Sequence, residues 1–220
     1  MTTPNTTSRS RYGANDESLS DWLLLHKRTV SWAILAVAAV VAVLWFMQRQ
    51  RTIKAQRAES AYFQARRSAA AGNMPLAISD LQKVAARYEG TLAGTQASLS
   101  LAQALYDQKK FKEGIEALKK AESSASDDLK ASVHVLEADG YEEMKNFDAA
   151  ADQYKLAVQA TRFPAEKTQY QAAAARAYMA AGKTAEAKAI WSELAKDDTS
   201  PEAAEAKVRL GEVTAQPVKI

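Results

Sequence analysis

Four columns of residues that recur along the chain constrain its fold more than any other feature. They run in one phase, at successive steps of 37, 36 and 37 residues. Two columns hold small residues: Ala65, Ala102, Ala138 and Ala175 in the first, and Ala77, Gly114, Ala150 and Ala187 in the second. A third column holds large apolar residues, Leu81, Leu118, Tyr154 and Trp191, and a fourth holds Val84, Ala121, Ala157 and Leu194. Such self-similarity indicates one structural unit repeated four times.

Each unit is predicted to be a pair of antiparallel helices. From residue 55 onward alanine is abundant and runs of β-branched residues are absent, as expected for helices. Short breaks separate a longer helix from a shorter one at residues 72–75, 108–110, 145–146 and 182–183. Small residues let the two helices approach closely, and the large apolar residue fills the space toward the next unit. Because one hairpin cannot bury its own apolar face, the hairpins should stack into an all-α solenoid.

The columns resemble the tetratricopeptide repeat (TPR). Its pair of small residues occurs in every unit, and Tyr141 and Tyr178 occupy a position where that repeat often has tyrosine. Pro164 and Pro201 correspond to its terminal proline. The resemblance implies a TPR-like domain of about four hairpins over residues 58–213. Its last helix should cap the open end of the stack, followed by a tail over residues 214–220.

An uncharged apolar segment, VSWAILAVAAVVAVLWFM, occupies residues 30–47. At about 1.5 Å per residue a helix of this length spans roughly 27 Å, close to the hydrocarbon thickness of a bilayer. Trp32 and Trp45 lie near its two ends, where indole rings favour the headgroup level. We expect a transmembrane helix over residues 29–48, in contact with lipid. A cleaved signal peptide is less favoured because its apolar region is usually shorter, and a core helix would need apolar surroundings on all faces.

The segments flanking the span are polar. The leader, residues 1–28, is predicted to contain a short amphipathic helix over 16–28, or else an N-terminal extension of the transmembrane helix. A basic juxtamembrane linker is predicted over 49–57, within a stretch, 48–67, that holds six Lys or Arg and one acid. Contact with anionic headgroups explains this stretch. Residues 68–220 hold 19 basic and 22 acidic side chains, so no basic face for nucleic acid is expected.

The composition argues against catalysis. The absence of cysteine excludes disulfides, thiol chemistry and zinc–thiolate sites. Of the two histidines, His26 lies beside the predicted span and His134 has no histidine partner, which disfavours a histidine metal site. Residues 182–184 read Gly-Lys-Thr but lack the upstream glycine of a phosphate-binding loop. We therefore expect no enzyme activity, no cofactor, no metal and no small-molecule substrate.

The first helices of the hairpins are expected to line a concave surface that binds protein segments. Aromatic and aliphatic residues mixed with charge suit that role. The candidate residues are Tyr62, Arg66, Leu99, Gln103, Tyr106, Val135, Asp139, Glu142, Arg176 and Met179. Alternatively, Tyr62, Leu99 and Tyr106 pack between neighbouring helices, since aromatic residues at helical spacing are often core residues.

The whole layout, a short leader, one span and an alanine-rich domain of four hairpins, resembles the YfgM-like family. The strings ASLSLAQAL at 97–105, DDLKASVHVLEAD at 127–139 and AGKTAEAKAIWSEL at 181–194 support this resemblance. It implies an ancillary subunit of the SecYEG translocon in the bacterial inner membrane. The N-terminus would be cytoplasmic and the repeat domain periplasmic, where it would hand exported clients to periplasmic chaperones.

Two alternatives to this interpretation remain open. The first is a tethered helical-repeat adaptor of another bacterial envelope complex, in cytochrome maturation, pilus or cell-division machinery. The second concerns orientation. More basic residues follow the span than precede it, and the positive-inside rule taken alone would place the repeat domain in the cytoplasm. Long domains can translocate largely regardless of charge, so the charge count does not decide the matter.

Overall fold

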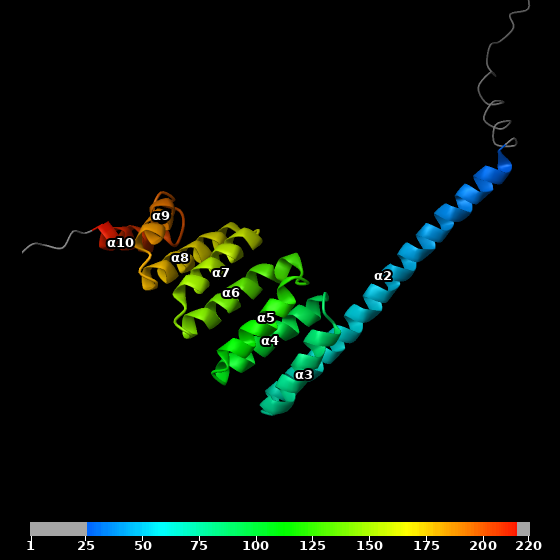
Figure 1. Cartoon of the computed structure of the whole chain (residues 1–220), viewed down its shortest axis with the longest axis horizontal. Coiled ribbons are helices and arrows are strands. Elements are labelled where there is room, and N and C mark those ends of the chain that lie inside the picture. Colours follow the sequence, from blue (N-terminus) through cyan, green and yellow to red (C-terminus); the bar gives the residue numbers. More distant parts are fainter. Residues whose placement is uncertain (1–25, 215–220) are drawn as a thin grey trace, which may run out of the picture. The chain divides into compact units, whose positions relative to one another are not determined.

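The computed structural model describes residues 26–214, which form nine α-helices and no strand (Figure 1). The helices are α2 (Lys27–Ala70), α3 (Met74–Arg87), α4 (Leu92–Asp107), α5 (Phe111–Glu122), α6 (Asp127–Glu143), α7 (Phe147–Ala160), α8 (Pro164–Ala180), α9 (Thr184–Leu194) and α10 (Ala203–Thr214). The predicted all-α class is therefore confirmed over this range. The chain divides into two compact units, one up to Thr52 and one from Ile53 onward.

The first unit contains the apolar part of α2. Within the described range α2 is long and apolar enough to cross a membrane, by length and composition alone, and its most apolar window has no buried residue. The helix does not end after this segment. Residues 49–57, predicted as a linker, are helical, because Gln, Arg, Lys and Ala favour helix and no Gly or Pro interrupts them. Most of the predicted amphipathic helix over 16–28 lies outside the described residues.

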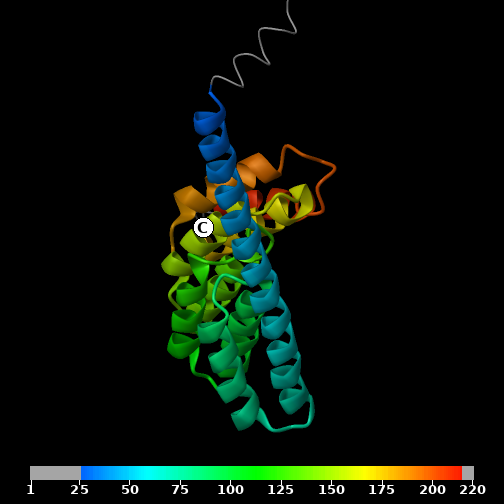
Figure 2. The same ribbon diagram turned by 90° about the vertical axis from the view of Figure 1, so that its right-hand side faces the viewer.

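The second unit is the predicted stack of hairpins. The C-terminal part of α2 pairs with α3, and Figure 2 shows the two helices side by side, joined by a short turn. Next come the α4–α5, α6–α7 and α8–α9 hairpins. All sixteen residues of the four sequence columns are buried. Ala138 and Ala150 lie in one core cluster, and the indole of Trp191 is fully buried in the same cluster. The repeat register read from the sequence is thus confirmed.

The buried side chains form three separate clusters. One joins the first hairpin to α4 and includes Leu81 and Leu101. A second joins the α4–α5 hairpin to α6, around Leu118 and Val133. The third fills the last two hairpins around Trp191. Each cluster therefore spans the boundary between one hairpin and the first helix of the next, as expected for a solenoid.

The turn within each hairpin has one residue in the left-handed region of backbone space. These residues are Gly72 (φ 79°), Lys109 (φ 62°), Lys145 (φ 58°) and Gly182 (φ 77°), at the same steps as the repeat. The next residue is the N-cap of the second helix. In two hairpins this residue is an asparagine whose side chain caps the helix: Asn73 accepts from the Leu76 N–H at 3.2 Å, and Asn146 from the Ala149 N–H at 3.3 Å.

Helix α10 takes the place of the predicted capping helix. It buries Ala203 and Ala206 against the preceding hairpin, and Leu210 packs on the core cluster of Trp191. Its other face is exposed, including Val208. The predicted tail, 214–220, lies outside the described residues except for Thr214, the last residue of α10.

Candidate functional site

The ten candidate groove residues all lie on the first helix of a hairpin. Tyr62 and Arg66 are on α2; Leu99, Gln103 and Tyr106 are on α4. Val135, Asp139 and Glu142 are on α6, and Arg176 and Met179 are on α8. Arg66, Gln103 and Arg176 are exposed, Tyr106 is buried, and the other six are half-buried.

The structure brings three of these residues together in one cleft between α4 and α6, which we call the α4–α6 cleft. Its volume is about 360 Å³. It is lined by Gln103, Tyr106, Asp107, Lys109, Phe111, Leu136, Asp139 and Glu143. The rings of Tyr106 and Phe111 lie 5.7 Å apart in a tilted arrangement. The cleft thus combines an aromatic and aliphatic wall with three carboxylates and one lysine.

Two carboxylates at this surface, Asp139 in the α4–α6 cleft and Glu142 beside it on α6, are half-buried. Asp139 accepts a hydrogen bond of 2.9 Å from the Tyr154 hydroxyl, and burial raises the pKa of Asp139 despite that bond. Burial, and then the charge of Asp139, raises the pKa of Glu142. Because burial penalises the charged form of these side chains, a cation brought near them would be favoured. The α4–α6 cleft can therefore hold an apolar side chain beside a basic group.

Two of the predicted aromatic residues serve the packing of the stack. The Tyr106 hydroxyl donates to the Leu136 carbonyl at 3.0 Å, which ties α4 to α6. Burial, and then the charges of Glu137 and Asp139, raises the pKa of Tyr106, so this hydroxyl stays protonated. The Tyr62 hydroxyl lies 3.0 Å from the Ser100 hydroxyl and its ring packs on the core of the first hairpin. Leu99 similarly packs on the second core cluster.

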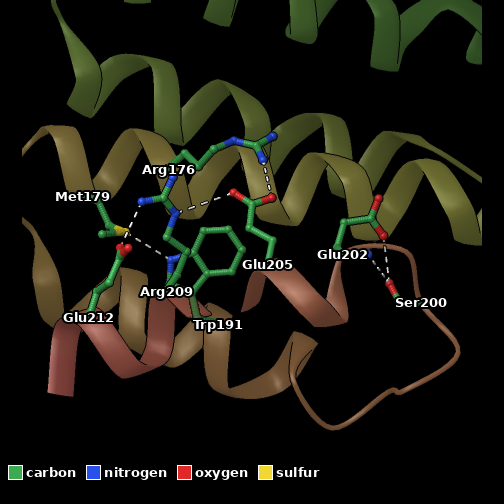
Figure 3. Close-up of polar contacts among 8 residues, drawn as sticks. All are labelled: Arg176, Met179, Trp191, Ser200, Glu202, Glu205, Arg209 and Glu212. Carbon is green, nitrogen blue, oxygen red and sulfur yellow. Dashed lines mark hydrogen bonds and ion pairs between the residues drawn. The ribbon is translucent and has the colours of Figure 1, made fainter. Parts of the chain in front are cut away.

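The candidate residues on α8 make contacts within the fold (Figure 3). The Arg176 guanidinium donates to Glu205 on α10 at 2.7 Å. Met179 accepts a hydrogen bond from the Trp191 indole, with sulfur and nitrogen 3.3 Å apart. On α10, Arg209 forms ion pairs with Glu205 and Glu212. The close-up therefore shows a polar network of Arg176, Glu205, Arg209 and Glu212 that joins α8 to the capping helix. The bond between Trp191 and Met179 is separate from this network and joins α9 to α8.

Other residues at the site were missed by sequence reasoning. Lys109 belongs to the turn after α4, Phe111 is the first residue of α5, and Leu136 belongs to α6; their place in the α4–α6 cleft depends on how the hairpins stack. Only the repeat register could have indicated these residues, because residues next to each break lie close to the following hairpin. The partner of Arg176 was also missed, because no pattern links Arg176 to Glu205 across 29 residues.

A buried carboxylate is a further residue that no sequence pattern indicated. Glu137 on α6 is fully buried, and neither of its oxygens has a hydrogen-bond partner among the described residues. Burial, and then the charge of Glu122, raises the pKa of Glu137 to about 7, while Lys119 opposes the shift. The nearby His134 is also buried, with Nδ1 2.9 Å from the Gln153 side-chain oxygen. His134 is thus a packed residue.

Comparison with known proteins agrees with the hairpin architecture. The tetratricopeptide repeat model matches residues 62–128 and 172–216. A putative kinesin light chain from Podosopora anserina, with nearly identical TPR-like repeats, superposes with a TM-score of 0.54 at 20% identity over 71% of this chain and 85% of its own. The MamA 41-end fragment from Desulfovibrio magneticus RS-1 superposes with a TM-score of 0.53 at 14% identity over 71% and 82%.

Identities this low show the fold alone. No curated protein sequence matches the chain. TPR-like proteins generally act as scaffolds that present an extended concave surface to other proteins. The buried repeat columns, the stacked hairpins and a family match over just over half of its residues show that this chain belongs to the tetratricopeptide repeat family.

Proposed function

We propose that this protein is a membrane-anchored scaffold for protein binding and an ancillary subunit of the bacterial Sec translocon, of the YfgM-like kind. Residues 29–48 would cross the inner membrane with the N-terminus in the cytoplasm. The repeat domain would lie in the periplasm and help hand exported proteins to periplasmic chaperones. Lipid, translocon subunits and exported clients or chaperones are the partners in this proposal, which needs no cofactor.

The observation that supports the anchor is the exposure of the apolar part of α2. Its most apolar window has no buried residue. An exposed apolar segment of this length costs free energy in water, since each buried CH₂ group is worth about 0.8 kcal/mol. Lipid or a partner helix must therefore cover it, and a bilayer matches its length.

The surface that supports protein binding is the α4–α6 cleft. Its aromatic wall offers a large contact area, and the rigid rings lose little conformational freedom on binding. The carboxylates beside the wall can orient a basic group of the bound segment. A segment of a client protein with apolar and basic side chains fits this combination. Such an open cleft on a solenoid suits extended or helical segments better than small molecules.

Affinity purification tests the translocon role. A tagged full-length protein should co-purify with translocon subunits from mildly solubilised membranes. A variant in which residues 30–47 are replaced by an unrelated apolar sequence of equal length should lose them while remaining in the membrane. If translocon subunits accompany neither protein, the translocon role is wrong. Recovery of subunits from another envelope complex would favour the adaptor role instead.

Cysteine labelling tests the orientation. The chain has no cysteine, so a single Ser123→Cys variant, exposed after α5, reports on the repeat domain alone. In spheroplasts, a membrane-impermeant maleimide should label this variant. A Thr6→Cys variant should be labelled only after lysis. The reverse pattern would place the repeat domain in the cytoplasm, as the basic residues after the span would favour.

A further inference from the structure

We infer that the outer side of the first two hairpins carries a second protein-binding surface, which takes a basic amphipathic segment of a partner protein. This surface is a groove bounded by α3, α4 and α5, and we call it the outer groove. Figure 1 shows these helices side by side. The volume of the groove is about 570 Å³, larger than the α4–α6 cleft.

The outer groove and the α4–α6 cleft use opposite sides of α4. Gly94, Ser98, Leu101 and Leu105 line the groove, whereas Gln103 and Tyr106 line the cleft. At about 100° per residue these two sets point in roughly opposite directions around the helix axis. A partner in the outer groove therefore does not compete with a client in the α4–α6 cleft, and the proposal does not depend on the function of that cleft.

The floor of the groove is made of small and apolar side chains. Ser98 is 4% exposed, and its hydroxyl is already bonded to the Gly94 carbonyl within α4. Leu101 and Leu105 are buried beside it. Alanines of α3 and α5 complete the lining: Ala85, Ala86, Ala117 and Ala121. Since these side chains are short, the space between α3 and α5 stays open to apolar side chains of a partner.

The rim of the groove is acidic. Glu89 lies at the end of α3, and Glu113 and Glu116 lie on α5; Lys120 is the one basic residue of the lining. All four side chains belong to exposed residues. Within residues 26–214, none of the three carboxylates forms an ion pair. Unpaired carboxylates around an apolar floor complement a segment that carries Lys or Arg beside apolar residues.

The corresponding groove of the last two hairpins provides an internal comparison. It lies among α7, α8 and α9 and has a volume of about 330 Å³. Tyr178, Val158 and Ile190 occupy space there, and its ionisable lining apart from Tyr178 is one lysine, Lys155, and one carboxylate, Glu186. The size and negative charge of the outer groove are therefore not a necessary product of the repeat. The outer groove and the α7–α9 groove differ in both respects.

Peptide titration tests the inference. The probe is an 18-residue synthetic amphipathic peptide of Leu, Ala and Lys, added to full-length protein in nanodiscs of zwitterionic lipid. A Gln82→Cys variant carries an environment-sensitive fluorophore at the rim of the outer groove. A Gln159→Cys variant carries the same fluorophore in the α7–α9 groove. We expect a saturable change at position 82, none at position 159, and none at position 82 with a peptide in which Glu replaces Lys.

Further substitutions identify the surface that the peptide uses. The Glu113→Gln and Glu116→Gln pair should weaken binding about tenfold at low ionic strength, because two rim charges are lost. The Ala117→Trp variant should abolish binding by filling the groove. The matched Glu186→Gln and Val158→Trp variants should bind as the parent protein does, and so should an Asp139→Asn variant in the α4–α6 cleft. Circular dichroism establishes that each variant is folded.

Three results would overturn the inference. If the peptide with Glu in place of Lys bound as tightly as the Lys peptide, charge complementarity would not explain the binding. Loss of binding in the Asp139→Asn variant, with no effect of the Glu113 and Glu116 pair, would move the peptide to the α4–α6 cleft. A change of oligomeric mass in the Ala117→Trp variant, without any peptide binding to the parent protein, would assign the groove to a second copy of this chain.

Discussion

The hydroxyl of Tyr106 occupies the space beside Gly140 where a side chain would begin: a Cβ atom built on Gly140 would lie 2.3 Å from the Tyr106 oxygen. The same ring closes on Gly114 of α5, where a Cβ would lie 2.3 Å from the Tyr106 Cε1 atom. One tyrosine thus packs against glycines of two neighbouring helices, at the boundary between the second and third hairpins.

A Gly140→Ala substitution should therefore destabilise the repeat domain by about 2 kcal/mol, because Tyr106 must leave its place and its bond to Leu136. Denaturant unfolding followed by circular dichroism measures the change. A Tyr106→Leu substitution should cost less in the Gly140→Ala background than alone. Gly211→Ala on α10 is the control, since no atom lies within 4 Å of its Cβ and helix propensity should make it slightly stabilising. If the effects of Gly140→Ala and Tyr106→Leu on stability were additive, the contact between Tyr106 and Gly140 would be contradicted.

The hairpin turns differ in how well their residues suit a positive φ. Lys145 pays a steric cost at φ 58° that Gly182 avoids at φ 77°. A Lys145→Gly substitution should raise the free energy of unfolding by about 0.5 kcal/mol, and Gly182→Ala should lower it by about 1 kcal/mol. Thermal unfolding of the two variants, compared with the parent protein, checks the opposite signs. If both substitutions changed the free energy of unfolding in the same direction, the positive φ of the turn residue would not explain the effects.

Helix caps in the turns offer an independent change in stability. Asn146 caps α7 through its side chain, whereas Lys110 at the start of α5 makes no such bond. A Lys110→Asn substitution should stabilise the domain, and Asn146→Ala should destabilise it, each by about 1 kcal/mol. Amide hydrogen exchange in the first turn of α5 should slow in the Lys110→Asn variant. Exchange in the first turn of α7 should become faster in the Asn146→Ala variant. Unchanged exchange at both helix starts would exclude a capping effect.

Glu137 should make stability depend on pH. Its carboxyl keeps a proton in the folded state up to a pKa of about 7, while its ordinary value is 4.5. The folded state therefore binds more protons between these values, and stability falls as pH rises from about 4.5 to 7, by on the order of 3 kcal/mol. A Glu137→Gln variant should lose most of this dependence and be the more stable protein at pH 8. Glu143→Gln, an exposed neighbour on α6, should keep it; equal slopes in both variants would exclude Glu137 as the source.

The pair formed by Arg176 and Glu205 should matter for the capping helix and little for global stability. Both side chains are partly exposed, at 45% and 32%, so breaking the pair should cost about 0.5 kcal/mol. An Arg176→Glu variant should expose α10 to limited proteolysis, and adding Glu205→Arg should restore resistance. Cleavage within α6 or α7 instead would show that the effect is not confined to the end of the stack.

The fold could be predicted because its determinants repeat. A small residue where two helices cross and a large one facing the next unit must recur once per hairpin, and all sixteen such residues are buried. Helix boundaries followed from Gly, Asn and Pro at three of the breaks, and from the repeat spacing at residues 108–110. The continuation of α2 through residues 49–57 was less apparent, since a basic stretch has the same composition in a linker and in an exposed helix.

The candidate site was predictable only in part. The repeat register placed all ten residues on the correct helices, but helical periodicity does not separate a concave face from the faces between neighbouring helices. Tyr106 and Tyr62 therefore pack against other helices, as the alternative interpretation had it. The burial of Glu137 could not be predicted, because it depends on how closely α5 approaches α6, and sequence spacing does not describe that distance.

Because the buried side chains are divided into three clusters, the two ends of the stack share no buried residue. A change that loosens the packing of Trp191 affects the last two hairpins, and the first hairpin keeps its own core. New partners can thus select substitutions at one end without requiring compensation at the other. A chain of this kind can acquire a second binding surface while the first one stays under constraint.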